Sequence, residues 1–371
     1  MSPQDVLLAR GRELLRQARS RGRGWEGLPP VPADSGARDA NELDRMQLAC
    51  ALQYHFDEAS PADAELVRRL LEQEISWRRV DPQQGVGETL EICCWLVARA
   101  GHPQDVWLLA RAKTANFDTA CGLSRELLFC GGVTETLDHV RQSHRPERAA
   151  VLAELVDEDD EPLVAEADLA SWRQAQVQGQ PATPQDEPLA CWISRALTLG
   201  HRREAKELVA QWAKDRVRDG DFFAEYAGYL QDLGDFAAEA DARGVLLAHL
   251  TDAFERAGAL GRAAAAERRA QRWTRALAHL GHTALLHRNH RQWRELGLGR
   301  GLVQEAFDLA ACAPPPVDAQ AFALAEEFAA ATPRLPPAAL EAAVATAQRL
   351  AAPGRELHYQ RLLEASRAGG Q

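Results

Sequence analysis

Two tryptophans flank a leucine–glycine–histidine turn at two places in the chain, with the same spacing each time. The first copy spans residues 192–212 and the second 273–293, and a shorter version occupies 95–107. Apolar residues recur every three or four positions on both sides of the central glycine, which predicts a helix, a turn and a second helix. Glycine suits the turn because it has no Cβ and tolerates the left-handed backbone that ends many helices.

A pair of amphipathic helices cannot bury its apolar faces alone and must stack on neighbouring pairs. Valine- and isoleucine-rich runs with a period of two, typical of strands, are nearly absent from the sequence. These patterns predict an all-α fold of stacked antiparallel helix pairs. In the second half of the chain, we expect turns at Gly200, Gly220, Gly234, Gly258 or Gly261, and Gly281.

Proline- and glycine-rich stretches suggest how the chain is divided. An N-terminal helix with a Gly/Pro-rich linker would occupy residues 1–40, and a helical domain 41–177. A second linker is expected at 178–188, followed by helical repeats at 189–312. A triple proline then separates the C-terminal helices, 313–371.

The repeat period points to a known family. Gly200 and Gly234 are 34 residues apart, and about 34 residues with two helices is the period of tetratricopeptide repeats. Residues 199–205 and 233–236 resemble the turn and second-helix start of such a repeat. Tetratricopeptide repeats carry small residues where their two helices cross. At the corresponding positions this chain departs from the pattern and has Ile193, Thr274 and Leu286. The resemblance covers 189–293 and implies a right-handed α-solenoid, TPR-like or HEAT-like.

Charge is distributed unevenly along the chain. The formal net charge is -11, so the whole molecule should repel nucleic acid and anionic membranes. Residues 147–170 hold nine acids against one arginine, whereas 262–300 hold nine arginines against two glutamates. A local basic face is therefore compatible with the acidic total.

Cysteine usage and the N-terminus suggest a compartment. Seven cysteines occur without zinc-ligand spacing, and their number is odd, which favours reduced thiols in a cytoplasm. Residues 1–19 include acids and lack an apolar core, so no signal peptide is expected. The longest apolar run, 92–98, is too short for a membrane span. We therefore expect a cytoplasmic, bacterial-type protein without a cofactor.

The segment 113–122 is the most enzyme-like stretch. Cys121 could gain thiolate character at the start of the following helix. Asn116, Asp118 and Lys113 could contact a ligand or partner. The candidate bases are His102, His139 and His144. The structural alternative, which we favour over catalysis, is an Asx turn with a packed thiol.

Two patterns resemble metal sites. Residues 279–290 read H-x2-H-x4-H-x2-H, and His287 and His290 could form one edge of a site if Gly281 turns the chain. Helix-terminal and surface histidines are the favoured alternative. The acidic run 157–161 resembles an aspartate-rich magnesium motif, but no second motif accompanies it, so we expect a solvated loop.

Arginines of the second half could hold phosphates. Arg268, Arg272 and Arg275 share one face of a predicted helix, as in helical repeats that bind the DNA backbone. Glu267 interrupts the cluster, and the chain is acidic overall. An ordinary solvated face, or a surface facing the acids of 157–161, is therefore favoured.

We predict a protein- or peptide-binding scaffold or regulator, in which acidic side chains in a groove select a basic ligand. One alternative is an enzyme centred on residues 116–121. The other is a nucleic-acid-binding repeat that uses the arginines of 262–300.

Overall fold

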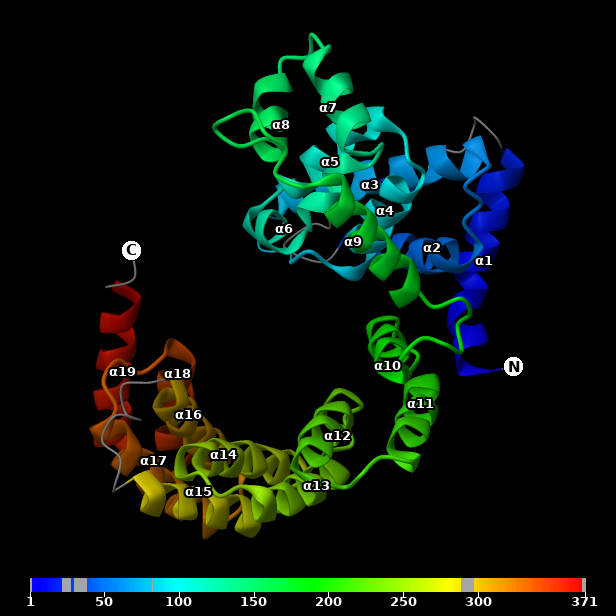
Figure 1. Cartoon of the computed structure of the whole chain (residues 1–371). Helices are drawn as coiled ribbons and strands as arrows, with labels where there is room; N and C mark the ends of the chain where they lie inside the picture. Colours follow the sequence, from blue (N-terminus) through cyan, green and yellow to red (C-terminus); the bar gives the residue numbers. More distant parts are fainter. Residues whose placement is uncertain are drawn as a thin grey trace. The chain divides into compact units, whose positions relative to one another are not determined.

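The computed structural model describes residues 2–21, 28–29, 39–81, 83, 85–287 and 297–368. Over these ranges the chain forms α-helices and two short 3-10 helices, with no strand (Figure 1). Val156 and Pro162 form one isolated bridge. The predicted all-α class is confirmed. Trp293, His290 and most of the predicted 21–39 linker lie outside the described residues.

The chain divides into two compact units, residues 1–208 and 209–371. The helices up to this division are α1 (Pro3–Arg21), α2 (Glu42–His55), α3 (Pro61–Val80), α4 (Glu88–Arg99), η2 (Pro103–Asp105), α5 (Val106–Lys113), α6 (Phe117–Gly122), η3 (Arg125–Phe129), α7 (Val133–Arg141), α8 (Arg148–Leu155), α9 (Glu166–Gly179) and α10 (Leu189–Thr198). The first unit ends within α11 (Arg202–Lys214). The division predicted from the linker at 178–188 stays a prediction.

In its described residues, the second unit contains the end of α11 followed by four consecutive helix pairs. They are α12 (Gly220–Asp232) with α13 (Phe236–His249), α14 (Ala253–Arg269) with α15 (Trp273–His287), α16 (Gly297–Cys312) with α17 (Val317–Ala331), and α18 (Pro337–Arg349) with α19 (Pro353–Ala368). Successive pairs also touch: α14 contacts α16, α15 contacts α17, and α16 contacts α18. Alanines fill much of this core, and their small side chains let the helices approach closely.

Side-chain caps begin two helices at serine residues, a residue type that favours helix starts. The Ser2 hydroxyl accepts the Asp5 N–H at 3.2 Å, and the Ser60 hydroxyl accepts the Asp63 N–H at 3.3 Å. A cap of this kind satisfies an otherwise unpaired amide and contributes about 1 kcal/mol.

The turn predicted at Gly200 is confirmed. Its φ is +74°, and the next amide, that of His201, donates to the Ala196 carbonyl at 2.8 Å. Gly234 has a φ of +71° and the same pattern, with the Asp235 amide donating to Leu230. Both helices end with the hydrogen bonding that a left-handed residue permits.

The turns expected at Gly258, Gly261 and Gly281 are wrong, because α14 and α15 continue through these residues. The chain turns between the two helices instead, where Gln271 has a φ of +59°. An interior glycine costs a helix only about 1 kcal/mol. The apolar stripes on either side can therefore hold each helix straight through its glycine.

Helix α4 lies at the centre of the first unit. It contacts α2, α3, α5 and η3, and most of its residues from Thr89 to Ala98 are buried. Ile92 and Glu91 interrupt this buried run. Helix α4 therefore presents one stripe outward while the rest of its surface packs.

Buried charges join the N-terminal segments of the first unit. Arg45 donates to Glu74 at 2.6 Å and pairs with Asp39 at 2.5 Å. Arg78 donates to the same Glu74 at 2.7 Å. The Arg45 guanidinium also donates to the Leu28 carbonyl, so residues 28 and 39 are fixed to α2 and α3. We call Asp39, Arg45, Glu74 and Arg78 the Arg45 network.

None of the helices within the described ranges combines the length and apolarity that a bilayer-spanning segment needs.

Candidate functional site

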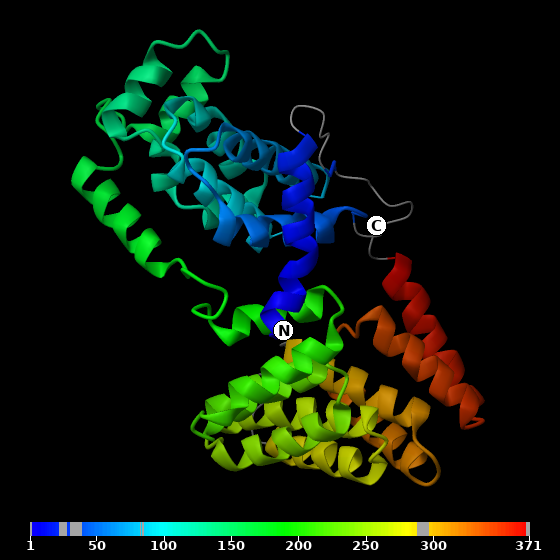
Figure 2. The same ribbon diagram turned by 90° about the vertical axis from the view of Figure 1, so that its right-hand side faces the viewer.

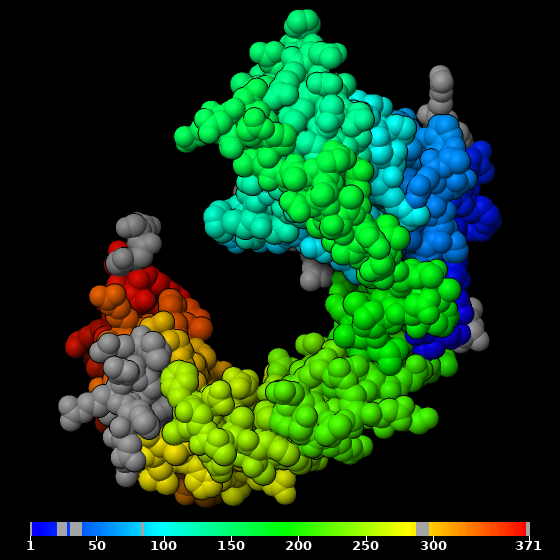
Figure 3. Space-filling model, viewed as in Figure 1, coloured from blue at the N-terminus to red at the C-terminus, as the bar shows by residue number. Residues whose placement is uncertain are grey.

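Helix α9 is loosely attached to the first unit. Of its residues, all of which are described, only Leu169 is buried. The Arg173 guanidinium anchors the helix by donating to the carbonyls of Phe129 and Cys130, both at 2.7 Å. Figure 2 shows α9 along the edge of the unit, and Figure 3 shows its surface in green. At the start of the helix, the Glu166 carboxylate also accepts the Val133 amide at 3.0 Å, and most of α9 is exposed.

A cavity of about 530 Å³ lies between α9, α4, the segment 122–127 and the segment 180–195. We call it the α9 cleft. A second cavity of about 330 Å³ adjoins it. Trp95 and Trp172 line both cavities, and their rings meet edge to face with centroids 5.8 Å apart. This tryptophan pair therefore separates the two hollows and offers aromatic surface to each.

The outward stripe of α4 forms one wall of the cleft. Glu88, Glu91 and Trp95 all line the cavity. Their spacing of three and four residues places them on one helix face. The charged residues of the lining are Glu88, Glu91, Glu187 and Arg195. The lining thus contains three carboxylates and one guanidinium.

Arg195 is buried at the base of the cleft, with 3% of its side chain exposed. It donates to Glu187 at 2.5 and 2.9 Å, and to Glu88 at 2.7 and 3.0 Å. It also donates to the Gln53 amide oxygen at 3.2 Å, and Tyr54 donates to Glu187. Arg195 therefore joins α2, α4, α10 and the segment before α10, and it occupies two of the three carboxylates.

Glu91 is the carboxylate that Arg195 does not occupy. Among the described residues it has no hydrogen-bond or ion-pair partner. Desolvation, together with the charge of Glu88, raises the pKa of the Glu91 carboxyl. Both effects disfavour an isolated negative charge at this position. A cation bound in the cleft would offset both effects by its attraction to the carboxylate.

Cys191 also lines the cleft. Burial, followed by the charge of Glu187, raises the pKa of the Cys191 thiol. The protonated thiol is a poor nucleophile. The geometry of the cleft therefore favours binding of a cation over thiol chemistry.

The structure uses two of the predicted ligand contacts to build α6. The Asn116 side chain accepts the Thr119 amide at 2.9 Å, and the Thr119 hydroxyl accepts the Asn116 amide at 3.0 Å. Lys113 donates to the carbonyls of Ala120 and Leu123, both at 2.8 Å. These contacts fit the capped turn of the structural alternative. The packed thiol expected with it is wrong, because Cys121 is exposed.

The other candidates of this segment are placed as follows. Asp118 and Cys121 are exposed. The Trp107 indole N–H donates to His139 Nε2 at 3.1 Å. This nitrogen of a candidate base is therefore already used as a hydrogen-bond acceptor. No contact joins Cys121 to His102, His139 or His144 among the described residues. The contacts of this segment therefore do not provide the thiol–imidazole pair that the enzyme alternative needs.

Replacing Asn116 with alanine should destabilise α6 by about 1 kcal/mol, because the cap is lost. Hydrogen exchange of amides 117–122 measures this effect. Cys121→Ala, in the same helix, should leave the exchange almost unchanged. Equal exchange in Asn116→Ala and the unmodified chain would contradict the capping role.

The three predicted phosphate-binding arginines are paired with acids of their own unit. Arg268 donates to Glu305 at 2.6 and 2.9 Å. Arg272 donates to Asp241 at 2.5 Å, and Arg275 lies 3.8 Å from Glu267. The positive charge is therefore largely balanced within the second unit.

The acidic run 157–161 forms a closed, exposed turn, as expected for a solvated loop. The Asp157 carboxylate accepts the amides of Asp159 and Glu161 at 2.9 and 3.0 Å. Arg141 donates to Asp160 at 2.9 Å.

The predicted histidine metal edge cannot be placed. His279 and His282 lie on the continuous helix α15, the side chain of His287 is not described, and His290 lies outside the described residues. In the described part of the chain, no group of three or more His, Cys, Asp or Glu side chains could hold an ion.

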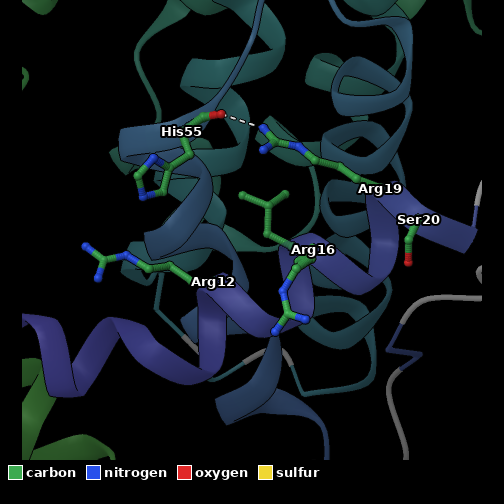
Figure 4. Close-up of a pocket in the computed structure, with 6 residues that line it drawn as sticks. Arg12, Arg16, Arg19, Ser20 and His55 are labelled. Carbon is green, nitrogen blue, oxygen red and sulfur yellow. Dashed lines mark hydrogen bonds between the residues drawn. The ribbon is translucent and has the colours of Figure 1, made fainter.

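A separate hollow, of about 520 Å³, lies between α1 and the end of α2 (Figure 4). Its lining includes Arg12, Arg16, Arg19 and His55. Arg19 donates to the His55 carbonyl at 2.6 Å, and the three guanidinium groups point in different directions. The acids that engage these arginines are Asp5, Glu13 and Asp63. The acids therefore balance the charge of the three arginines, and the guanidinium groups do not converge on one point.

Sequence reasoning missed the cleft residues Glu91, Trp172, Glu187 and Arg195. One feature could have found Arg195. It lies within the apolar stripe of α10, between Trp192 and Ala196, and all three are buried. An arginine on a buried face requires acidic partners. The sequence alone does not say which acids these are.

No family model matches this chain, and a comparison with curated proteins finds no match.

Proposed function

We propose that this chain is a helical-repeat binding protein and that the α9 cleft takes a basic segment of a protein partner. The observation that carries the proposal is the charged lining, in which three glutamates face one arginine beside two tryptophans. Acidic and aromatic side chains together recognise cationic groups through charge and cation–π attraction.

The tryptophans support a peptide ligand. Aromatic side chains supply large contact areas with few rotatable bonds, and they often dominate binding. The buried Trp95 indole N–H has no acceptor among the described residues. A carbonyl of a bound chain could satisfy this donor after a small rearrangement of the tryptophan pair.

We further propose that the helix pairs form a right-handed α-solenoid related to tetratricopeptide repeats. The contacts between successive pairs of the second unit support this arrangement. In such folds a fixed frame carries a variable binding surface. The free thiols of the seven cysteines, all within the described ranges, fit a reducing cytoplasm.

The paired state of Arg268, Arg272 and Arg275 favours a protein partner over nucleic acid. Phosphate binding would have to displace Glu305, Asp241 and Glu267 from them. The net charge of -11 opposes polyanions as well.

Selection from a random peptide library on the full chain tests this proposal. Peptides rich in arginine or lysine should be enriched, and Trp172→Ala should lose them. Gln174→Ala on the same helix, an exposed residue that lines neither cavity, is the matched control and should retain most of them. Enrichment of acidic or purely apolar peptides, or equal enrichment on Trp172→Ala, would refute the proposal.

A further inference from the structure

The α9 cleft contains one carboxylate that the fold itself does not use. Glu88 and Glu187 are held by Arg195, and the Arg195 side chain is almost completely buried. Glu91 lies one helical turn after Glu88 and one turn before Trp95. Its carboxylate has no ion-pair or hydrogen-bond partner in the described part of the chain.

We infer that Glu91 is the residue that determines specificity in the α9 cleft, and that its ligand is the guanidinium group of an arginine side chain. This inference rests on the proposed function. It adds the identity of the recognised group and of the residue that recognises it.

The lining favours a guanidinium over an ammonium group. A guanidinium is planar and weakly hydrated, stacks on aromatic rings and can donate two parallel hydrogen bonds to one carboxylate. Trp95 follows Glu91 on the same face of α4, and Trp172 meets it from α9. The protein uses a similar arrangement internally, because the Arg195 guanidinium lies 4.6 Å from the centre of the Trp192 ring while paired with two glutamates.

The surrounding charges also favour a cation. The titratable groups of the cleft are Glu88 and Glu91 on α4, Glu187 before α10, and Cys191 and Arg195 on α10. The α9 residues that line it, Trp172, Gln176 and Gly179, carry no charge. With the carboxylates ionised, the lining keeps an excess of negative charge after Arg195 is counted. A bound guanidinium reduces that excess.

Binding should release protons. In the free protein, desolvation and Glu88 raise the pKa of the Glu91 carboxyl, and a bound guanidinium lowers it. Between these two pKa values, Glu91 is more protonated in the free protein than in the complex. Affinity should therefore fall as the pH is lowered through the raised pKa.

Calorimetric titration of the full chain with N-acetyl-Gly-Arg-Gly-amide tests the inference. The peptide with citrulline in place of arginine has almost the same shape but no charge, and should bind at least about tenfold more weakly. Glu91→Gln should weaken binding of the arginine peptide by a similar factor and abolish proton release, measured in buffers of different ionisation enthalpy. Glu207→Gln, a surface change of the same charge on α11, should alter neither quantity.

The outcomes separate the two proposals. Equal affinity of Glu91→Gln and the unmodified chain for the arginine peptide overturns the role of Glu91 and leaves the cleft proposal standing. Equal binding of the citrulline peptide overturns guanidinium recognition. If no basic peptide binds, and library selection yields none, both proposals fail. Circular dichroism of Glu91→Gln should match the unmodified chain, since the Glu91 carboxylate has no partner among the described residues that the change would remove.

Discussion

Replacing Glu74 with alanine should lower the free energy of unfolding of the first unit by about 3–5 kcal/mol, because two buried arginines lose a shared partner. The side chains of Arg45 and Glu74 are 0% and 3% exposed. Arg45 would keep Asp39, but among the described residues Arg78 would keep only the backbone carbonyls of Glu74 and Val86. The fold cannot rehydrate these charges without opening its core.

Glu72 provides the matched control, since it lies on the same helix with 54% of its side chain exposed. Its 3.7 Å pair with Arg111 is exposed on both sides, so Glu72→Ala should cost at most about 1 kcal/mol. Hydrogen exchange of α3 and α4 amides in urea reports on the first unit separately from the second. A loss below about 1 kcal/mol for Glu74→Ala would show that the Arg45 network does not stabilise this unit.

Replacing Trp192 with alanine should cost about 3–5 kcal/mol, as expected for a fully buried aromatic side chain. Trp192 is 0% exposed and stacks on Tyr54 with ring centroids 6.1 Å apart. Its indole donates to the Pro184 carbonyl at 2.9 Å. The change therefore creates a cavity and also releases the segment that carries Glu187 into the cleft.

Trp192→Phe separates these two effects. It keeps most of the aromatic volume but loses the hydrogen bond to Pro184, so the cost should fall to about 1–3 kcal/mol. Urea unfolding with hydrogen exchange of α10 measures both variants. Equal stability of Trp192→Ala and Trp192→Phe would contradict a packing role for the indole.

Local signals in the sequence predict much of the fold. The caps at Ser2 and Ser60 and the turns at Gly200 and Gly234 depend on residues within a few positions, so the sequence contains their cause. Gly281 was misleading because a glycine can also lie inside a helix at small cost. The apolar residues around it, not the glycine itself, decide where the helix ends.

The candidate site was much harder to predict. The stripe of Glu88, Glu91 and Trp95 on one face of α4 can be read from spacing alone. That this stripe lines a binding cleft depends on Trp172 and Arg195, which come from distant parts of the chain. Asn116 attracted attention as a polar residue in a loop, yet its side chain caps α6. A polar side chain that closes a local turn and one that faces a ligand look alike in a sequence.

The most direct test of the central claim is hydrogen exchange of the full chain with and without a basic peptide selected from the library. The account predicts slower exchange in α4, in residues 122–127 and in α9, the elements that line the α9 cleft. Protection confined to α12–α19, with the first unit unchanged, would contradict it and would place the binding surface on the second unit.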